Sequence, residues 1–193
     1  MEVTSMLFSA GEKELLCGMI GRKLERFRCD DDREAGAGIC AWGVIGLCVG
    51  DEVFAFLREE RSVKRCGVID DWPVTRLERA SSFQITSRLV GVKQRDWLIG
   101  QIINDIRVYE DSEFRFEEGI DLYRYDYTSA VLFQLERTQL VLSCSDMVES
   151  IDIYQGPHAE ESVRPVSLSI DESEIDEYRV ERRVVSLKEA SKR

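Results

Sequence analysis

The sequence predicts an α+β fold in which an N-terminal helix packs on mainly antiparallel β-hairpins and a meander. An apolar stripe of helical period follows a helix-start motif at residue 9. Apolar runs separated by short turns then dominate residues 39–156. The chain has 193 residues, 44% of them hydrophobic, which is enough for one sizeable core. We therefore expect a single α+β domain over residues 1–160 and a charged C-terminal extension over residues 161–193.

The predicted helix runs from about Ser9 to Arg28. Ser9 and Glu12 stand in the order of a capping box, in which each side chain bonds the backbone amide of the other residue. The apolar positions that follow recur after four, four and three residues: Leu16, Ile20, Leu24 and Phe27. Because residues at these spacings share one face of a helix, we expect the stripe to face the core.

Two apolar hairpins are predicted in the middle of the chain. Residues 39–49 and 53–57 flank a Gly-Asp turn, and residues 129–135 and 139–144 flank a short polar turn. We expect the core to include most of a set of eight large apolar side chains from these hairpins: Trp42, Ile45, Phe54, Phe56, Leu132, Phe133, Leu140 and Leu142.

The segments around these hairpins are less uniform. Residues 74–79 alternate as a short edge strand, and residues 102–127 are predicted to form a meander with a polar turn at residues 110–113. Residues 81–97 fit a helix and a strand equally well, so periodicity leaves both open.

The C-terminal extension changes charge along its length. Asp171 to Glu177 holds five carboxylates in seven positions, whereas Tyr178 to Arg193 holds six Lys or Arg against two Glu. Three structures fit this composition: an amphipathic helix, an added strand through Val180, Val184 and Leu187, or a partly disordered tail.

The charge balance restricts the partners of this chain. Its 26 basic and 37 acidic side chains give a net charge of −11, which repels phosphate backbones and anionic lipid headgroups. We therefore expect neither direct nucleic-acid binding nor membrane binding. No apolar run approaches the roughly 18 residues of a membrane span, and the first ten residues lack the pattern of a signal peptide. The expected location is the cytoplasm.

The cysteines fit that location. No two of them are spaced as CxxC or CxxxC, the spacings that bring two thiolates to one metal ion. In a cytosolic chain such residues are usually reduced and pack as small apolar groups. We expect no metal and no cofactor, and six unpaired thiols: Cys17, Cys29, Cys40, Cys48, Cys66 and Cys144.

The order of four motifs carries a resemblance to a known group. These are Ala41–Gly46, Gly67–Asp71, Tyr125–Phe133 and Glu149–Gly156. Over about residues 40–156 the chain resembles an uncharacterised group of β-rich proteins encoded by gut Firmicutes and their mobile elements. The resemblance implies a β-rich fold, and it brings no established activity and no assigned catalytic residues.

The densest charge in the sequence marks the candidate binding site. Residues 110–121 hold six carboxylates against Arg115 alone: Glu110, Asp111, Glu113, Glu117, Glu118 and Asp121. Phe114 and Phe116 stand among them as apolar anchors, and Asp70 and Asp71 extend the acidic set. A field of this sign favours a basic partner.

Two functions of different class follow. The first is a non-catalytic acidic binding protein, a stoichiometric inhibitor that occupies the cationic groove of a basic nucleic-acid-handling protein such as a nuclease or CRISPR effector, as anti-CRISPR, anti-restriction and nuclease-immunity proteins do. The alternative is a small cytosolic enzyme that uses carboxylates or a cysteine. His158 is the one histidine that could pair with Cys144 or Cys40, but no flanking signature supports such a pair. A pocket of converging polar groups would favour the enzyme.

Overall fold

The protein is built on one large and mostly antiparallel β-sheet. The computed structural model describes residues 2–30, 39–65, 68–89, 94–117, 120–144, 150–163 and 177–190. Within these ranges eleven strands join in the order β3-β10-β9-β8-β7-β2-β4-β5-β6, with β1 added to β8 and β11 added to β7. The strands are β1 (Glu2–Met6), β2 (Lys23–Asp30), β3 (Ile39–Trp42), β4 (Val44–Val49), β5 (Glu52–Arg65), β6 (Val68–Ala80), β7 (Gln94–Glu117), β8 (Ile120–Leu135), β9 (Gln139–Cys144), β10 (Ser150–Gly156) and β11 (Glu177–Ser186).

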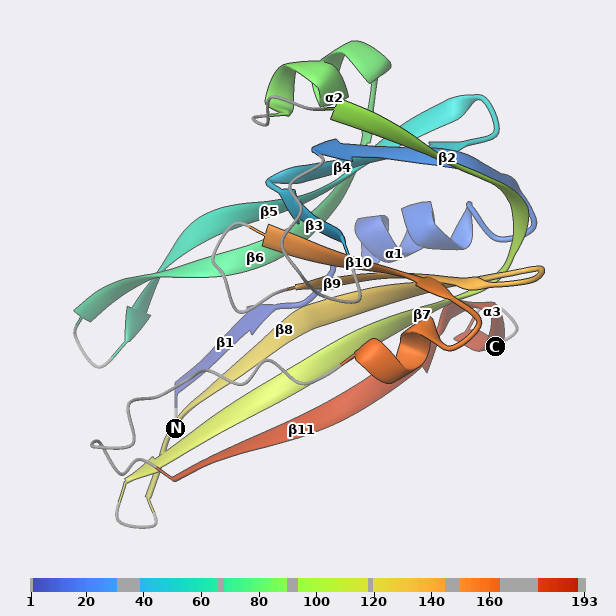
Figure 1. Cartoon of the computed structure of the whole chain (residues 1–193). Helices are drawn as coiled ribbons and strands as arrows, with labels where there is room; N and C mark the ends of the chain where they lie inside the picture. The colour runs from blue at the N-terminus through green and yellow to red at the C-terminus, as the bar shows by residue number, and fades with distance from the viewer. Residues whose placement is uncertain are drawn as a thin grey trace.

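The helices are short compared with the strands. They are α1 (Ala10–Cys17), α2 (Ser82–Arg88), the 3-10 turn η1 (Ala159–Ser162) and α3 (Leu187–Ala190). Figure 1 shows α1 lying between the two halves of the sheet, with α2 on the outer side of β4 and β5. The predicted α+β class is therefore wrong, because strands dominate and no long helix packs on them.

The predicted helix from Ser9 to Arg28 is correct only at its start. The Ser9–Glu12 capping box is present, but α1 ends at Cys17 and the chain turns through Gly21, whose φ of 83° suits glycine. Residues 23–30 form β2 instead. A β-bulge between Leu24 and Arg26 shifts the register, so Leu24 and Phe27 both face the core although they are three residues apart. The bulge thus imitates helical spacing.

Two features connect the two halves of the sheet. The 24-residue strand β7 pairs with β2 through residues 94–102 and with β8 through residues 103–117. At the other margin β3 pairs with β10, and the chain passes through Gly43 directly into β4, which pairs with β2 and β5. Gly43 has a φ of 73°, a left-handed conformation that permits this sharp change of direction.

The main core fills the space between the two halves. It combines Leu16 and Met19 from the α1 region with side chains of β2, β4 and β5 on one side and of β7 to β10 on the other. Of the eight predicted core residues all but Trp42 are buried, which confirms the hairpin reading of this region: Ile45, Phe54, Phe56, Leu132, Phe133, Leu140 and Leu142.

The structure also shows what three further segments form: residues 81–97, residues 110–113 and the C-terminal segment. Residues 81–97 contain both a helix, α2, capped by Ser81 and Gln84, and the start of β7. The predicted turn at residues 110–113 is wrong, because these residues continue β7 between β8 and β11. The C-terminal segment adopts the added-strand alternative, since β11 pairs with β7 from Glu177 to Ser186. None of the helices in the described ranges has the length and apolar content needed to cross a membrane.

The contact between α2 and β4 yields a stability prediction. A Cβ atom added at Gly46 would lie 2.7 Å from Ile85 Cγ2, which is too close for two carbon atoms. We expect Gly46→Ala to lower the free energy of unfolding by about 1–3 kcal/mol, measured by urea denaturation. Gly11→Ala is the control, because nothing lies within 4 Å of its added Cβ. Equal stability of the two variants would contradict this packing.

Candidate functional site

The first half of the predicted acidic block lies inside the protein. Residues 110–113 occupy β7 at a point where β8 and β11 flank it on both sides. Glu110, Asp111 and Glu113 are 6%, 0% and 1% exposed. Asp111 and Glu113 stand directly opposite Tyr127 and Tyr125 of β8, so their side chains share one face of the sheet with these rings.

Asp111 forms a buried ion pair with Arg182. Both of its carboxylate oxygens accept from Arg182 of β11, with Nε–Oδ1 and Nη2–Oδ2 distances of 2.7 Å each. Arg182 also donates to the Val163 carbonyl at 2.9 Å and lies over the ring of Tyr109 at 5.4 Å. A fork of this kind is the strongest geometry for an arginine with a carboxylate. The pair therefore fixes β11 and the segment at Val163 against β7.

The neighbouring acidic and aromatic residues also have partners within the chain. Glu110 accepts from Lys13 of α1 at 2.7 Å. The Arg179 guanidinium lies 4.6 Å from the ring centre of Phe114 and 5.6 Å from that of Phe116, and Phe114 has Arg124 5.3 Å away on the same ring. These two aromatic residues are thus partly covered by cationic side chains.

The remaining predicted site residues do not all fall within the description. Asp71 is exposed and accepts from the Ser62 hydroxyl at 2.7 Å. The side chains of Asp70, Glu117 and Asp121, and the whole of Glu118, lie outside the described part of the structure. Glu110, Asp111 and Glu113 are buried, and Glu110 and Asp111 pair with Lys13 and Arg182 inside the chain, so these three side chains are not open to a partner.

A second aromatic cluster anchors the long β5–β6 hairpin. Trp72 of β6 stacks on Tyr125 of β8 with ring centres 4.8 Å apart and planes 10° apart. Tyr123 meets Tyr125 edge-on at 4.6 Å. The other members of this cluster are buried around them: Met6, Val74 and Tyr127. Stacked aromatic pairs of this kind hold the hairpin against β8 in one orientation.

Two buried tyrosines, Tyr127 of this cluster and Tyr109 of β7, have shifted pKa values. Burial, together with the negative charges of Asp111 and Glu113, raises the pKa of Tyr127. Burial also raises the pKa of Tyr109, and the hydrogen bond that its hydroxyl donates to Glu160 at 2.8 Å adds to the effect. Both groups therefore favour the neutral phenol in the folded state.

The residues considered for an enzyme differ in their surroundings: Cys144, His158 and Cys40. Cys144 is buried, its Sγ is 2.7 Å from the Thr75 hydroxyl, and burial raises the pKa of its thiol, which disfavours the nucleophilic thiolate. His158 precedes η1 with a side chain that is 78% exposed, 3.5 Å from Glu161. Cys40 is half-buried in β3. No group of three or more His, Cys, Asp or Glu side chains that could hold a metal ion occurs in the described ranges.

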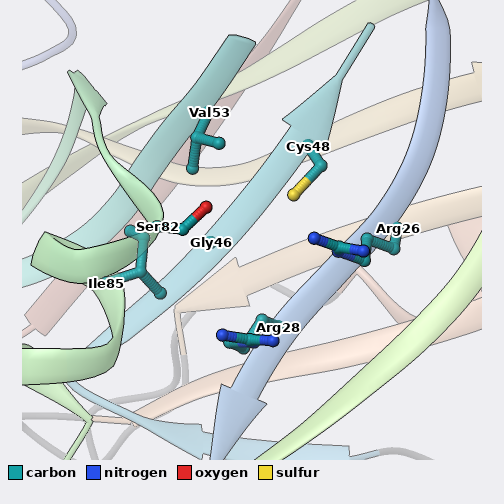
Figure 2. Close-up of a pocket in the computed structure, with 7 residues that line it drawn as sticks. All are labelled: Arg26, Arg28, Gly46, Cys48, Val53, Ser82 and Ile85. Carbon is teal, nitrogen blue, oxygen red and sulfur yellow. The ribbon is translucent and has the colours of Figure 1, made fainter. Parts of the chain in front are cut away.

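A pocket that the sequence did not indicate lies beside α2. Its lining comes from β2, β4, β5 and α2: Arg26, Arg28, Gly46, Cys48, Val53, Ser82 and Ile85. Figure 2 shows the guanidinium groups of Arg26 and Arg28 and the Cys48 sulfur on one side, with Ile85 and Ser82 of α2 on the other. The pocket encloses about 10 Å³, room for roughly one water molecule or one ligand oxygen.

The sequence contains a pattern that indicates this pocket, but the helical period predicted for residues 9–28 hides it. Arg26 and Arg28 alternate with Phe27 and Cys29, which are fully buried, so the segment follows the two-residue period of a strand. A helical reading scatters the two arginines over different faces. Only the strand places them side by side.

Comparison of the chain with protein-family models, with curated proteins and with solved structures finds no match in any of the three. The resemblance to the β-rich group from gut Firmicutes therefore stays an expectation.

The buried ion pair gives the first prediction for this region. Asp111→Ala leaves the Arg182 guanidinium, which is 19% exposed, without its carboxylate. We expect this variant to lose about 3–5 kcal/mol of unfolding free energy in chemical denaturation. Glu181→Ala is the matched control, because its pair with Arg179 is more than half exposed on both sides, and it should change stability by about 0.5 kcal/mol or less. A loss below about 1 kcal/mol for Asp111→Ala would show that the pair is not structural.

The tyrosines give a second prediction. A group whose pKa is raised by folding stabilises the protein fully below its ordinary pKa and loses that contribution as the pH rises toward the folded value. We expect the free energy of unfolding to fall above about pH 10, the ordinary tyrosine pKa, and Tyr127→Phe to weaken this fall. Tyrosinate absorbance should show that Tyr109 and Tyr127 ionise only when the chain unfolds. Ionisation of all six tyrosines near pH 10 in the folded protein would contradict their burial.

Proposed function

We propose that this protein is a non-catalytic binding protein, a stoichiometric inhibitor of a basic nucleic-acid-handling protein such as a nuclease or CRISPR effector. Its partner-facing element is the distal hairpin, defined here as residues 59–65 of β5 and 68–72 of β6. Of the binding residues that the sequence predicts, Asp70 and Asp71 belong to this element, whereas Glu110, Asp111 and Glu113 lie in the interior.

The observation that carries this proposal is an exposed apolar side chain on a hairpin that is anchored at its base. Ile69 of β6 is 70% exposed, and the hairpin extends away from the body of the sheet in Figure 1. Its base is held by the stack of Trp72 on Tyr125. A strand pair that is already ordered loses little conformational entropy on binding, so an exposed anchor on it is used efficiently.

The charges around Ile69 favour a polar rim around this anchor. By strand register one face of the hairpin carries Glu60, Ser62, Ile69 and Asp71. Glu60 and Asp71 are exposed. The whole chain has a net charge of −11, which steers encounter toward a cationic surface, while Ile69 supplies the contact that excludes water.

The proposal includes a cytoplasmic location, where nucleic-acid enzymes are found. Cys48 and Cys144 are free thiols, as is usual in a reducing compartment.

Titration against candidate nucleases and CRISPR effectors tests the proposal. The protein should bind one of them in a fixed ratio, inhibit its nucleic-acid cleavage, and bind more weakly as the salt concentration rises. Ile69→Ser should reduce the affinity by about tenfold or more, equivalent to about 1.4 kcal/mol, because it removes the apolar anchor.

The matched control is Val184→Ser, which changes another exposed apolar residue, 47% exposed on β11. This variant should bind as the wild type does. Absence of any stoichiometric complex at low salt, or an equal effect of the two substitutions, would contradict the proposed function.

A further inference from the structure

The pocket beside α2 has a local positive charge in an acidic protein. Arg26 and Arg28 project from β2 on the same face, and Asp96 of β7 is the carboxylate that contacts both. Two guanidinium groups and one carboxylate leave a local charge of about +1 if each group carries its usual charge at neutral pH. Such a balance attracts an anion.

The two arginines have different roles in this arrangement. Arg28 is held in place, since its Nε and Nη2 donate to the two oxygens of Asp96 at 2.8 and 2.7 Å and its Nη1 donates to the Thr86 hydroxyl at 3.2 Å. The hydrogen bond from Arg28 keeps the pKa of Asp96 low, so this carboxylate stays charged and the fork stays closed. Arg28 is therefore held in one orientation, and most of its N–H donors already form hydrogen bonds within the chain.

Arg26 has an unused hydrogen-bond donor. Its Nε is buried and has no hydrogen-bond acceptor among the residues that the structure describes. The nearest carboxylate oxygen, Asp96 Oδ1, is 3.7 Å away, which is beyond hydrogen-bond distance. A buried donor without an acceptor costs free energy, which is recovered when a water molecule or a ligand oxygen fills the place.

We propose that this pocket binds an oxyanion of the phosphate type, such as inorganic phosphate or a phosphate monoester. The volume of about 10 Å³ accepts one oxygen atom, and the pocket is partly open, so the rest of the anion stays outside. Arg26 supplies the donors, since its Nε is buried while the side chain as a whole is 41% exposed, and Val53 and Ile85 form apolar walls beside it. Gly46 lets Ile85 come close enough to form this wall.

The alkylation rate of Cys48 can report whether an anion occupies the pocket. Its thiol lines the same pocket and is half-buried, so an anion held there covers it. Alkylation by iodoacetamide, a neutral reagent, can be followed for each cysteine by peptide mass spectrometry. At a phosphate concentration ten times the Kd, we expect Cys48 to react about tenfold more slowly than in sodium chloride of equal ionic strength. The peptides that carry the other cysteines should react at the same rate in both salts.

Two variants assign the protection to Arg26. Arg26→Gln should abolish the difference between phosphate and chloride at Cys48, whereas Arg88→Gln should preserve it, because Arg88 lies on α2 but pairs with Glu78 instead of lining the pocket. Equal rates at Cys48 in phosphate and chloride for the wild type would overturn the proposal, as would protection that survives in Arg26→Gln. The site is separate from the distal hairpin, so its failure leaves the proposed function unaffected.

Discussion

Strand β7 is the constraint on which the rest of the structure depends. Its first nine residues belong to the half of the sheet that contains β2, β4 and β5, and its last fifteen belong to the half that contains β8 and β11. One continuous strand therefore sets the relation of the two halves, and the main core fills the space between them. The passage from β3 to β4 at Gly43 joins the halves again at the opposite margin.

The acidic part of β7 shows how a charged segment becomes interior. A strand flanked on both sides loses its backbone contact with water, and its side chains lie under whatever covers each face. Asp111 is tolerated there because Arg182 neutralises it through two hydrogen bonds, and Glu110 because Lys13 reaches it. A buried carboxylate without such a partner would be strongly unfavourable. This pairing is why the proposed binding surface is the distal hairpin and not the densest acidic block.

Short-range patterns predicted the hairpins and seven of the eight core residues, since alternation and tight turns are local properties. The helix to Arg28 was wrong because a β-bulge reproduced helical spacing at Leu24 and Phe27. The turn at residues 110–113 was wrong because the charges of Glu110 and Asp111 are paired with Lys13 and Arg182, which are distant in sequence. The pocket at Arg26 was missed because the helical period separates Arg26 from Arg28, and because its other walls come from β4, β5 and α2, which are distant in sequence.

Hydrogen–deuterium exchange along β7 tests the central claim most directly, namely that one unbroken strand joins both halves and carries the acidic segment inside. Backbone amides that bond to flanking strands exchange only when the structure opens. The account predicts that the amides of residues 108–114 exchange as slowly as those of β8 in the main core around Val131 and Phe133. Exchange of residues 110–113 at the rate of an exposed turn, with the rest of β7 protected, would contradict it.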